Sequence, residues 1–339
     1  MKNFLFFLIS LFVGVGLFAW AISFIGWKSV KEAFLVFSGW QGMVILGLTF
    51  LAALVGNLRW REILKEKNIS VSFFELLRSY LAGFSIMFLA PIILFGGEVF
   101  RGYALKERNG VTWQKGASSV LVDRILELTT NVFVIFLGII IFFLSNGFPS
   151  KKLAAIFLGV PLFLGVAIFI FYFKAFKKES LVEFLLKLLG LKSFGRQNGI
   201  LDIEKETLDF FKLNKKLLSK VFFLSFLRSG LMYLRTLFLI SFLGVKIGWL
   251  SAVSILGFTY LALLVPIPAA LGLHELIQAS AFNYFGVGLA SAAAFTMVIR
   301  GAELVVAFLG VFFLFRLGIS ILKTLLFKKL GLGNNNGHQ

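Results

Sequence analysis

Two carboxylates stand inside apolar stretches of the sequence, each at the same distance after a proline. Glu98 follows Pro91 by seven residues in "LAPIILFGGEVFRGYAL", and Glu275 follows Pro268 by seven residues in "LLVPIPAALGLHELIQ". A carboxylate among apolar residues can bind a cationic group or carry a proton, and it is costly to bury without a partner. These stretches therefore predict two polar positions in nonpolar surroundings.

Two arginine–glutamate pairs follow the same two regions. Arg124 and Glu127 are three residues apart in "DRILE", and Arg300 and Glu303 are three residues apart in "IRGAE". Side chains at this spacing share one face of a helix and can pair. Each pair is either a structural link between helices or part of a site for a charged ligand, and the duplication favours the ligand site.

Other polar residues in these regions have more ordinary interpretations. Arg124 lies only about six residues, or roughly 9 Å, into its apolar run, so its side chain could also reach the membrane surface. Arg59 and Arg61 end an apolar run where positive charge is common, and we expect them mainly to set the topology. Arg235 is less usual because it lies within an apolar run. His274 could relay protons or be a structural histidine.

The composition is that of a protein embedded in a membrane. Of the 339 residues, 59% are hydrophobic and 15% are charged, whereas about a quarter of the residues in soluble domains are charged. A helix that crosses a bilayer needs roughly 20 apolar residues. We expect an all-α polytopic membrane protein with about six full crossings. These lie at 4–26, 42–58, 119–145, 153–173, 217–243 and 290–315.

Residues that hold metals or carry out covalent chemistry are scarce. There is no cysteine and there are only two histidines, so thiolate catalysis and a metal centre are not expected. Nucleotide-binding and hydrolase motifs are also missing from plausible contexts. We expect no metal, no cofactor and no enzymatic activity. A membrane enzyme acting on a lipid-linked substrate, or a scaffold for one, remains the alternative.

The net charge of +18 is concentrated in four basic segments, at 59–78, 101–115, 174–220 and after Arg316. Such segments usually face the cytoplasm, where they attract the anionic lipids of the inner leaflet. The charge therefore indicates a membrane partner, and no nucleic-acid partner is expected. Both termini are predicted to lie in the cytoplasm, on a multi-pass protein of the cell membrane.

With this topology, each proline-containing stretch enters and leaves the membrane on one side. The stretch around Pro91 returns to the cytoplasm and the stretch around Pro268 returns to the outside, so each is expected to be a re-entrant helical hairpin. Proline interrupts a helix, glycine permits a reversal, and irregular backbone at membrane depth must be buried or line a wet cavity. The residues expected to form the hairpins are Pro91, Gly96, Gly97, Pro266, Pro268 and Gly272.

The two stretches belong to a longer internal repeat. The matched positions, offset by 176 or 177 residues, are Arg59 and Arg235, Pro91 and Pro268, Glu98 and Glu275, Arg124 and Arg300, and Glu127 and Glu303. An odd number of crossings separates the two copies, which predicts inverted repeats. In transporters built this way, broken helices meet near the membrane midplane and form the binding site.

We expect one membrane domain over residues 1–320, followed by a cytoplasmic tail at 321–339. The repeat halves are expected at about 42–145 and 217–316. The linker at 174–216 mixes lysine with apolar residues at helical spacing, which is typical of an amphipathic helix on a membrane surface.

Several segments resemble a known family. "GNLRWREIL", "RSYLAGFSIMFLAPIILFGGEVFRGYAL", "SSVLVDRILEL" and "PIPAALGLHE" are similar to the lysylphosphatidylglycerol synthase transmembrane-region family, also called flippase-like domain or UPF0104 proteins. The resemblance extends over roughly 4–320, and "PIPAALG" departs from the family's usual PGGLG-like run. In bifunctional members, this domain is credited with moving an aminoacylated lipid to the outer leaflet, and a separate cytosolic domain attaches the amino acid. Since that domain is missing here, the resemblance implies flippase-like transport without lipid aminoacylation.

We therefore expect a transporter that moves a phospholipid or a lipid-linked headgroup between leaflets by alternating access. Arginines would hold the phosphate through charge-assisted hydrogen bonds, and Glu98 and Glu275 would bind a cationic group or a coupling proton. The sequence leaves open the lipid, the direction, the energy source and the oligomeric state, with a homo-oligomer among the options. It also leaves open whether the two broken stretches are re-entrant or span the membrane fully, since 78–95 and 250–267 are each about 18 residues long. The expected substrate-binding residues are Glu98, Arg124, Glu127, Arg235, Glu275, Arg300 and Glu303, with His274 as a candidate proton relay.

Overall fold

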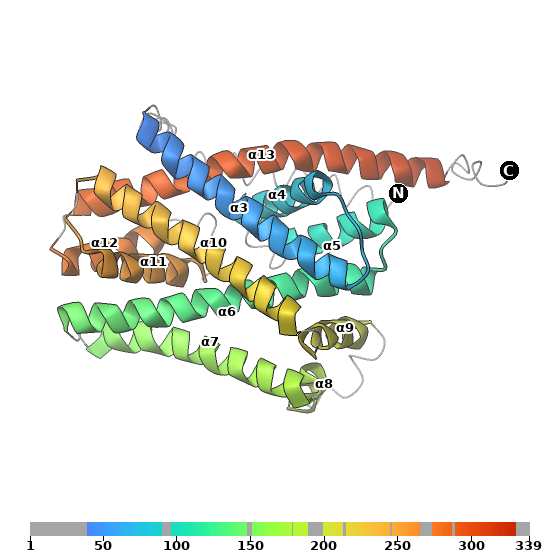
Figure 1. Ribbon diagram of the computed structural model, residues 1–339, viewed down its shortest axis with the longest axis horizontal. Helices are drawn as coiled ribbons and strands as arrows, with labels where there is room; N and C mark the ends of the chain where they lie inside the picture. The colour runs from blue at the N-terminus through green and yellow to red at the C-terminus, as the bar shows by residue number, and fades with distance from the viewer. Residues whose placement is uncertain are drawn as a thin grey trace.

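The computed structural model describes residues 39–89, 96–147, 151–177, 179–188, 199–212, 215–244, 246–264, 273–286 and 289–329. Regular structure in these ranges is entirely helical (Figure 1). The helices are α3 (Trp40–Glu66), α4 (Phe73–Leu89), α5 (Gly96–Asn109), α6 (Trp113–Asn146), α7 (Lys151–Lys177), α8 (Leu181–Leu188), α9 (Ile200–Lys212), α10 (Lys215–Phe242), α11 (Trp249–Leu263), α12 (Leu273–Tyr284) and α13 (Leu289–Lys329). The prediction of an all-α polytopic membrane protein is confirmed.

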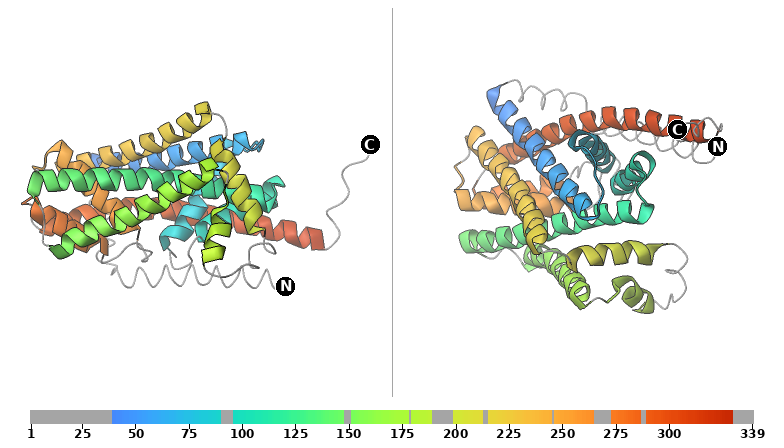
Figure 2. Two further views of the ribbon diagram at one scale, coloured as in Figure 1. Left: turned by 90° about the horizontal axis from the view of Figure 1, so that it is seen from below. Right: turned by 45° about the vertical axis from the view of Figure 1, so that its right-hand side comes forward.

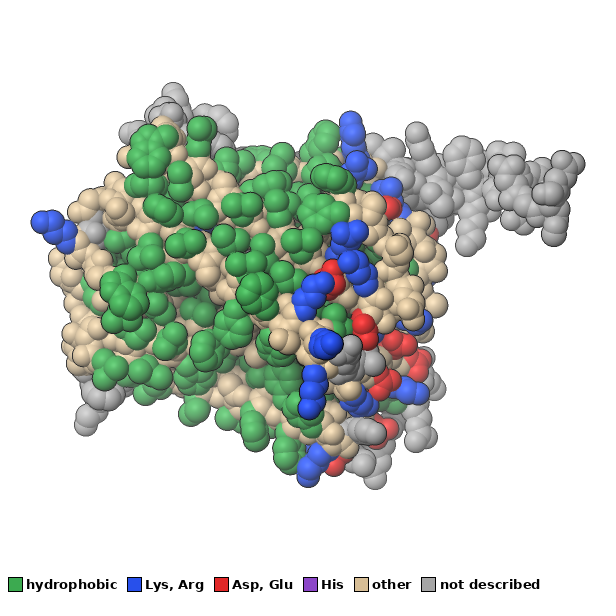
Figure 3. Space-filling view, in the orientation of Figure 1, with side chains coloured by type: hydrophobic (Ala, Val, Ile, Leu, Met, Phe, Trp, Pro, Cys, Tyr) green, Lys and Arg blue, Asp and Glu red, His purple; other side chains and the backbone are tan. Residues whose placement is uncertain are grey.

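Five of these helices, α3, α6, α7, α10 and α13, are long and apolar enough to cross a membrane. They coincide with five of the six expected crossings, and the sixth, at 4–26, lies outside the described residues. Hydrophobic side chains cover most of the surface in Figure 3, while lysine and arginine gather at the end where α8 and α9 lie. Exposed apolar side chains are the surface that a helix bundle presents to lipid.

Local sequence signals explain where several helices begin and end. Ser72 accepts a hydrogen bond from the backbone N–H of Glu75 at the start of α4, and Ser180 accepts one from the N–H of Glu183 at the start of α8. Serine followed three residues later by glutamate is the capping-box pattern. Gly147 ends α6 with a φ of +76°, a conformation that glycine adopts without steric cost.

Helices α4 and α5 form an antiparallel hairpin. Gly83 of α4 lies against Gly97 of α5, where a Cβ on Gly97 would sit 2.2 Å from the Gly83 carbonyl oxygen. Only glycine permits this approach. Further from the tip, Arg101 of α5 lies over the ring of Tyr80 of α4. The expected role of Gly97 in a tight hairpin thus has a steric cause.

Helices α11 and α12 form the corresponding hairpin of the second half. Gln278 of α12 donates hydrogen bonds to the Ile255 carbonyl oxygen and to Thr259 Oγ1 of α11. This hairpin lies at the left-hand end of Figure 1, whereas α4 and α5 lie toward the opposite end. The other residues expected to form the two hairpins lie outside the described residues. They are Pro91 in the first hairpin and Pro266, Pro268 and Gly272 in the second.

Each hairpin packs mainly against the other half of the chain. Helix α4 packs on α13 and α11 packs on α6, while α3 and α10 pack together between them. A Cβ on Gly310 of α13 would lie 2.1 Å from the Leu81 carbonyl oxygen of α4, and one on Gly138 of α6 would lie 2.9 Å from the Val253 carbonyl oxygen of α11. The two contacts are related by one offset of 172 residues. The first helix of each hairpin thus packs closely against the last long helix of the other half.

The expected amphipathic linker contains two short helices, α8 and α9. Helix α9 buries Leu208, Phe210 and Phe211 against residues of α6 and α7. Lys67, after α3, lies 3.1 Å from Glu206 of α9, and burial lowers the pKa of the Lys67 ammonium despite this carboxylate. Helix α9 is therefore docked on the bundle by both apolar packing and an ion pair.

Candidate functional site

Arg59 lies at the centre of a buried ionic cluster in the first half. It is 1% exposed, and its guanidinium donates to Asp123 at 2.7 Å, to Glu127 at 3.3 Å and to Ser225 Oγ at 3.1 Å. The interpretation of Arg59 as a topology determinant at a helix end was wrong. Helix α3 continues to Glu66, so Arg59 lies about two turns before its end and faces α6 and α10.

Glu127 of α6 joins three guanidinium groups. It accepts hydrogen bonds from Arg59, from Arg124 at 3.2 Å and from Arg228 of α10 at 2.7 Å. Arg124 also pairs with Glu98 at the start of α5. The expected i, i+3 pair of Arg124 and Glu127 is present, and it links the hairpin to α6, α3 and α10.

Arg101 is held in the same cluster by aromatic rings. Its guanidinium carbon lies 4.0 Å from the ring centroid of Trp60 and 4.7 Å from that of Tyr80, and its Nη2 donates to Asp123 at 2.9 Å. Cation–π contacts and a buried ion pair together fix this guanidinium. Tyr80 therefore supports a charged side chain.

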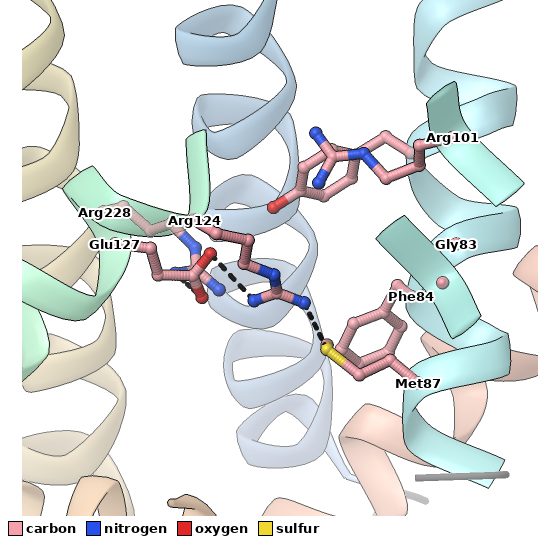
Figure 4. A pocket seen from close by; sticks show the side chains of 9 residues that line it. Gly83, Phe84, Met87, Arg101, Arg124, Glu127 and Arg228 are labelled. Atoms are coloured by element: carbon pink, nitrogen blue, oxygen red, sulfur yellow. Dashed lines mark hydrogen bonds and ion pairs between the residues drawn. The ribbon is translucent and has the colours of Figure 1, made fainter. Parts of the chain in front are cut away.

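A cavity opens beside this cluster, between the hairpin and α6 (Figure 4). Its volume is about 20 Å³, which is room for about one water molecule. In Figure 4, Arg124 lies between Glu127 on one side and Met87 on the other. The residues that line the cavity are Tyr80, Gly83, Phe84, Met87, Gly97, Arg101, Arg124, Glu127 and Arg228.

The second half contains a smaller cluster around Glu303 of α13. Glu303 accepts hydrogen bonds from Arg300 at 3.0 Å and from Arg235 of α10 at 3.4 Å. Arg235 also donates to Thr49 Oγ1 of α3 at 3.2 Å. Arg300 is 9% exposed, and its Nε and Nη2 have no hydrogen-bond partner among the described residues. A buried guanidinium with two free donors is prepared to bind an anion.

The two clusters repeat the same contacts. In each half, a glutamate of the last long helix accepts from the arginine three residues before it and from an arginine of α3 or α10. In each half, that second arginine also donates to a hydroxyl on the first helix of the other half. The paired hydroxyls, Thr49 and Ser225, are themselves 176 residues apart, which is the offset of Arg59 and Arg235.

The last turn of α4 separates the two clusters. Met87 contacts Arg124, and the next residue, Phe88, lies with its ring centroid 6.0 Å from the guanidinium carbon of Arg300. Phe84 stacks on Phe88 in the same turn. Neighbouring side chains at the end of α4 therefore contact an arginine of each cluster.

The clusters also differ at three matched positions. Arg101 corresponds to Gln278, Asp123 to Ile299 and Arg228 to Ala52 at the offsets of the repeat. Both members of the Arg101–Asp123 ion pair are therefore replaced by uncharged residues in the second half. There, Gln278 donates a hydrogen bond to Thr259 of α11. The first half has the richer cationic site.

Burial of so many charges within apolar helices has a physical cost. A single charge at the centre of a membrane helix costs about 2.5–3.5 kcal/mol on insertion scales, and such residues normally pair or face a polar cavity. The described charged residues follow this rule through mutual pairing. Within the described ranges, no group of three histidine, cysteine or acidic side chains comes together as metal ligands.

The structure places six of the seven expected substrate-binding residues in the two clusters. Glu98, Arg124 and Glu127 lie in the first cluster, and Arg235, Arg300 and Glu303 lie in the second. The side chains of His274 and Glu275 lie outside the described residues. Gly96 begins α5.

Sequence reasoning missed Arg101 and underrated Asp123, Arg59 and Arg228. Two signals could have found them. Asp123 stands in an apolar run and needs a cation, and Arg101 matches Gln278 at the offset of 177 that relates Glu98 to Glu275. Helix α6 begins at Trp113, so Arg124 lies eleven residues after the start of its helix.

The fold and the clusters define an all-α polytopic membrane protein in which two helical hairpins each lie beside an arginine–glutamate–arginine group. The chain belongs to the family described as lysylphosphatidylglycerol synthase TM region, which it matches over residues 7–310.

Similar proteins occur among the archaea. A UPF0104 membrane protein of Pyrococcus horikoshii is 25% identical over 266 residues, which cover 74% of this chain and 78% of the relative. A UPF0104 membrane protein of Methanothermobacter thermautotrophicus is 25% identical over 303 residues, covering 86% of this chain and 89% of the relative. These names state a family and a membrane location, and no specific activity.

Proposed function

We propose that the protein moves a phospholipid, or a lipid-linked headgroup, between the leaflets of the cell membrane. The observation that carries this proposal is the cavity between the hairpin and α6, which is lined by three arginines, Arg101, Arg124 and Arg228, and by Glu127. Guanidinium groups bind phosphate through paired, charge-assisted hydrogen bonds. A lipid headgroup is the phosphate-bearing group that is most abundant beside such a site.

In the proposed mechanism, the headgroup crosses through the protein while the acyl chains stay in the bilayer. The cavity has a volume of about 20 Å³, so it must enlarge to admit a headgroup. Two hairpins that open toward opposite ends of the bundle can do this alternately, since inverted repeats exchange roles between inward and outward states. The last turn of α4, with Met87 and Phe88, is the barrier that would have to move.

The acidic residues have a second role in this proposal. Glu98 pairs with Arg124 at the start of α5, so a proton or a cation that neutralises Glu98 would release Arg124 for the phosphate. Glu275 holds the matched position in the second half. The proposed orientation has both termini and the basic segments in the cytoplasm, where the segments contact anionic lipid.

We propose transport without chemical conversion of the lipid. The charged groups at the cavity are arginines and one glutamate, and tyrosine supplies the hydroxyl among its lining residues. This set binds an anion well, and it contains neither a serine or histidine nucleophile nor a pair of free carboxylates for general acid–base catalysis.

Reconstitution in liposomes tests the proposal. Purified protein would be incorporated with headgroup-labelled phospholipid, and a quencher added outside would report how fast label from the inner leaflet becomes accessible. We expect protein-dependent exposure, lost in Glu98→Gln and Glu275→Gln but kept in the control Glu179→Gln, whose side chain is 49% exposed. Transport that is insensitive to both hairpin variants would exclude the site, and chemical conversion of the lipid would exclude a transporter.

A further inference from the structure

The charges around the cavity in the first half do not balance. The cluster contains the guanidinium groups of four residues and the carboxylates of three, all in contact with one another through ion pairs. Among the residues that the structure describes, one positive charge is therefore in excess when all seven are ionised. The guanidinium groups belong to Arg59, Arg101, Arg124 and Arg228, and the carboxylates belong to Glu98, Asp123 and Glu127.

An uncompensated charge at this depth requires a counter-charge. Arg59 is 1% exposed and Arg101 is 4% exposed, and buried charges are stable only when they are paired and hydrogen-bonded. Arg101 and Arg228 each keep an Nε without a hydrogen-bond partner among the described residues. Since both side chains line the cavity, the N–H donors without a partner and the excess positive charge both lie at the cavity.

The carboxylates at the site are already occupied by cations. Glu98 pairs with Arg124, Asp123 pairs with Arg59 and Arg101, and Glu127 accepts from three arginines. The ammonium group of a zwitterionic headgroup would have to displace a guanidinium to reach any of them. A headgroup that carries only the phosphodiester charge meets no such penalty.

We propose that the cavity selects a lipid whose headgroup has a net charge of −1, with a phosphodiester and no amine. This inference rests on the proposed transport function and adds the class of lipid. Arg228 determines the selectivity, because it supplies the excess charge and because its matched position in the first half is the uncharged Ala52. Among the ion pairs of the cluster, Arg228 has Glu127 as its partner, so its removal leaves the other pairs in place.

A comparison of the transport rates of two labelled lipids, measured in separate vesicle preparations, tests this proposal. Vesicles of phosphatidylcholine would contain either labelled phosphatidylglycerol, which is anionic, or labelled phosphatidylcholine, which is zwitterionic. We expect the wild-type protein to move phosphatidylglycerol at least about tenfold faster. Arg228→Ala should reduce this ratio to about threefold or less, and Arg228→Lys, which keeps the charge, should retain most of it.

The outcomes separate this inference from the function on which it rests. Equal rates for the two lipids in the wild type would overturn the selectivity and leave lipid transport standing. Absence of transport for every lipid would overturn both. Radiolabelled glycerol phosphate added outside distinguishes a lipid headgroup from a soluble phosphate ester. Its uptake into the vesicles would overturn the assignment to a lipid.

Discussion

The two halves of this protein both pair a glutamate with arginines inside the bundle, but with different numbers of charged side chains. In the first half, Glu127 receives three arginines, and Asp123 joins Arg59 to Arg101. In the second half, Glu303 receives two arginines. The shared part shows what the inverted architecture needs, namely one carboxylate that ties two helices together. The additional part shows where the halves have diverged toward a richer anion site.

The largest expected effect comes from removing the central carboxylates. Glu127→Gln leaves three arginines with a neutral partner, of which Arg59 is fully buried and Arg124 and Arg228 are partly buried. Breaking a buried ion pair from one side costs about 3–5 kcal/mol. Glu303→Gln affects two arginines and should cost less. Thermal unfolding of both variants in detergent would check the order. A greater loss of stability in Glu303→Gln would contradict the view that the first half holds the stronger network.

The exchanged hairpins predict a smaller pair of effects. Gly310→Ala would place a Cβ 2.1 Å from the Leu81 carbonyl oxygen, and Gly138→Ala would place one 2.9 Å from the Val253 carbonyl oxygen. Overpacking typically costs about 1–3 kcal/mol, and we expect Gly310→Ala to be the more damaging.

Gly230→Ala is the matched control, because a Cβ on this helical glycine meets no atom within 4 Å. Alanine is favoured over glycine in helices by about 1 kcal/mol, so this variant should be neutral or more stable in the same unfolding measurement. If all three variants behave alike, the close contacts between the halves are not limiting.

A double substitution can make the first half resemble the second at one ion pair. Arg101→Gln and Asp123→Ile each leave a buried partner, so each alone should destabilise the protein. Combined, they reproduce the pair found at Gln278 and Ile299, and the coupling free energy should lie within about 0.5–3 kcal/mol. Rescue will be partial because Asp123 also pairs with Arg59. If the losses of unfolding free energy in the two single variants add up to the loss in the double variant, the two residues are not coupled.

The smallest effects concern the reciprocal hydroxyls. Thr49 accepts from Arg235 and Ser225 accepts from Arg59, at 3.2 and 3.1 Å. Thr49→Ala and Ser225→Ala should each cost about 1.5 kcal/mol or more, since hydrogen bonds to charged groups are worth about 1.5–3 kcal/mol. Denaturant midpoints of the two variants should agree closely. A clear difference would mean that the pseudo-symmetric contacts are unequal.

Much of the fold could be predicted from the sequence because its causes are local. The apolar runs predict α3, α6, α7, α10 and α13. The pairing of Arg300 with Glu303 also follows from helical spacing. Each of these signals lies within one helix or one turn.

The site was harder to predict because its contacts join distant helices. The partners of Arg59 lie 64, 68 and 166 residues away, and positive charge at the end of an apolar run looks like a topology signal. The sandwich of Arg101 between Trp60 and Tyr80 depends on how α5 packs against α3 and α4. Only the repeat carried long-range information, and it identified Arg124, Arg235 and Arg300 correctly as members of one recurring arrangement.

The most direct test of the account compares matched arginines of the two halves in the liposome assay. Arg124→Gln and Arg300→Gln would be measured beside Arg316→Gln, an exposed arginine on the same helix as Arg300. We predict that lipid transport falls more than about tenfold in both buried variants and stays near the wild-type rate in Arg316→Gln. Full transport in either Arg124→Gln or Arg300→Gln would contradict a mechanism that uses both inverted halves.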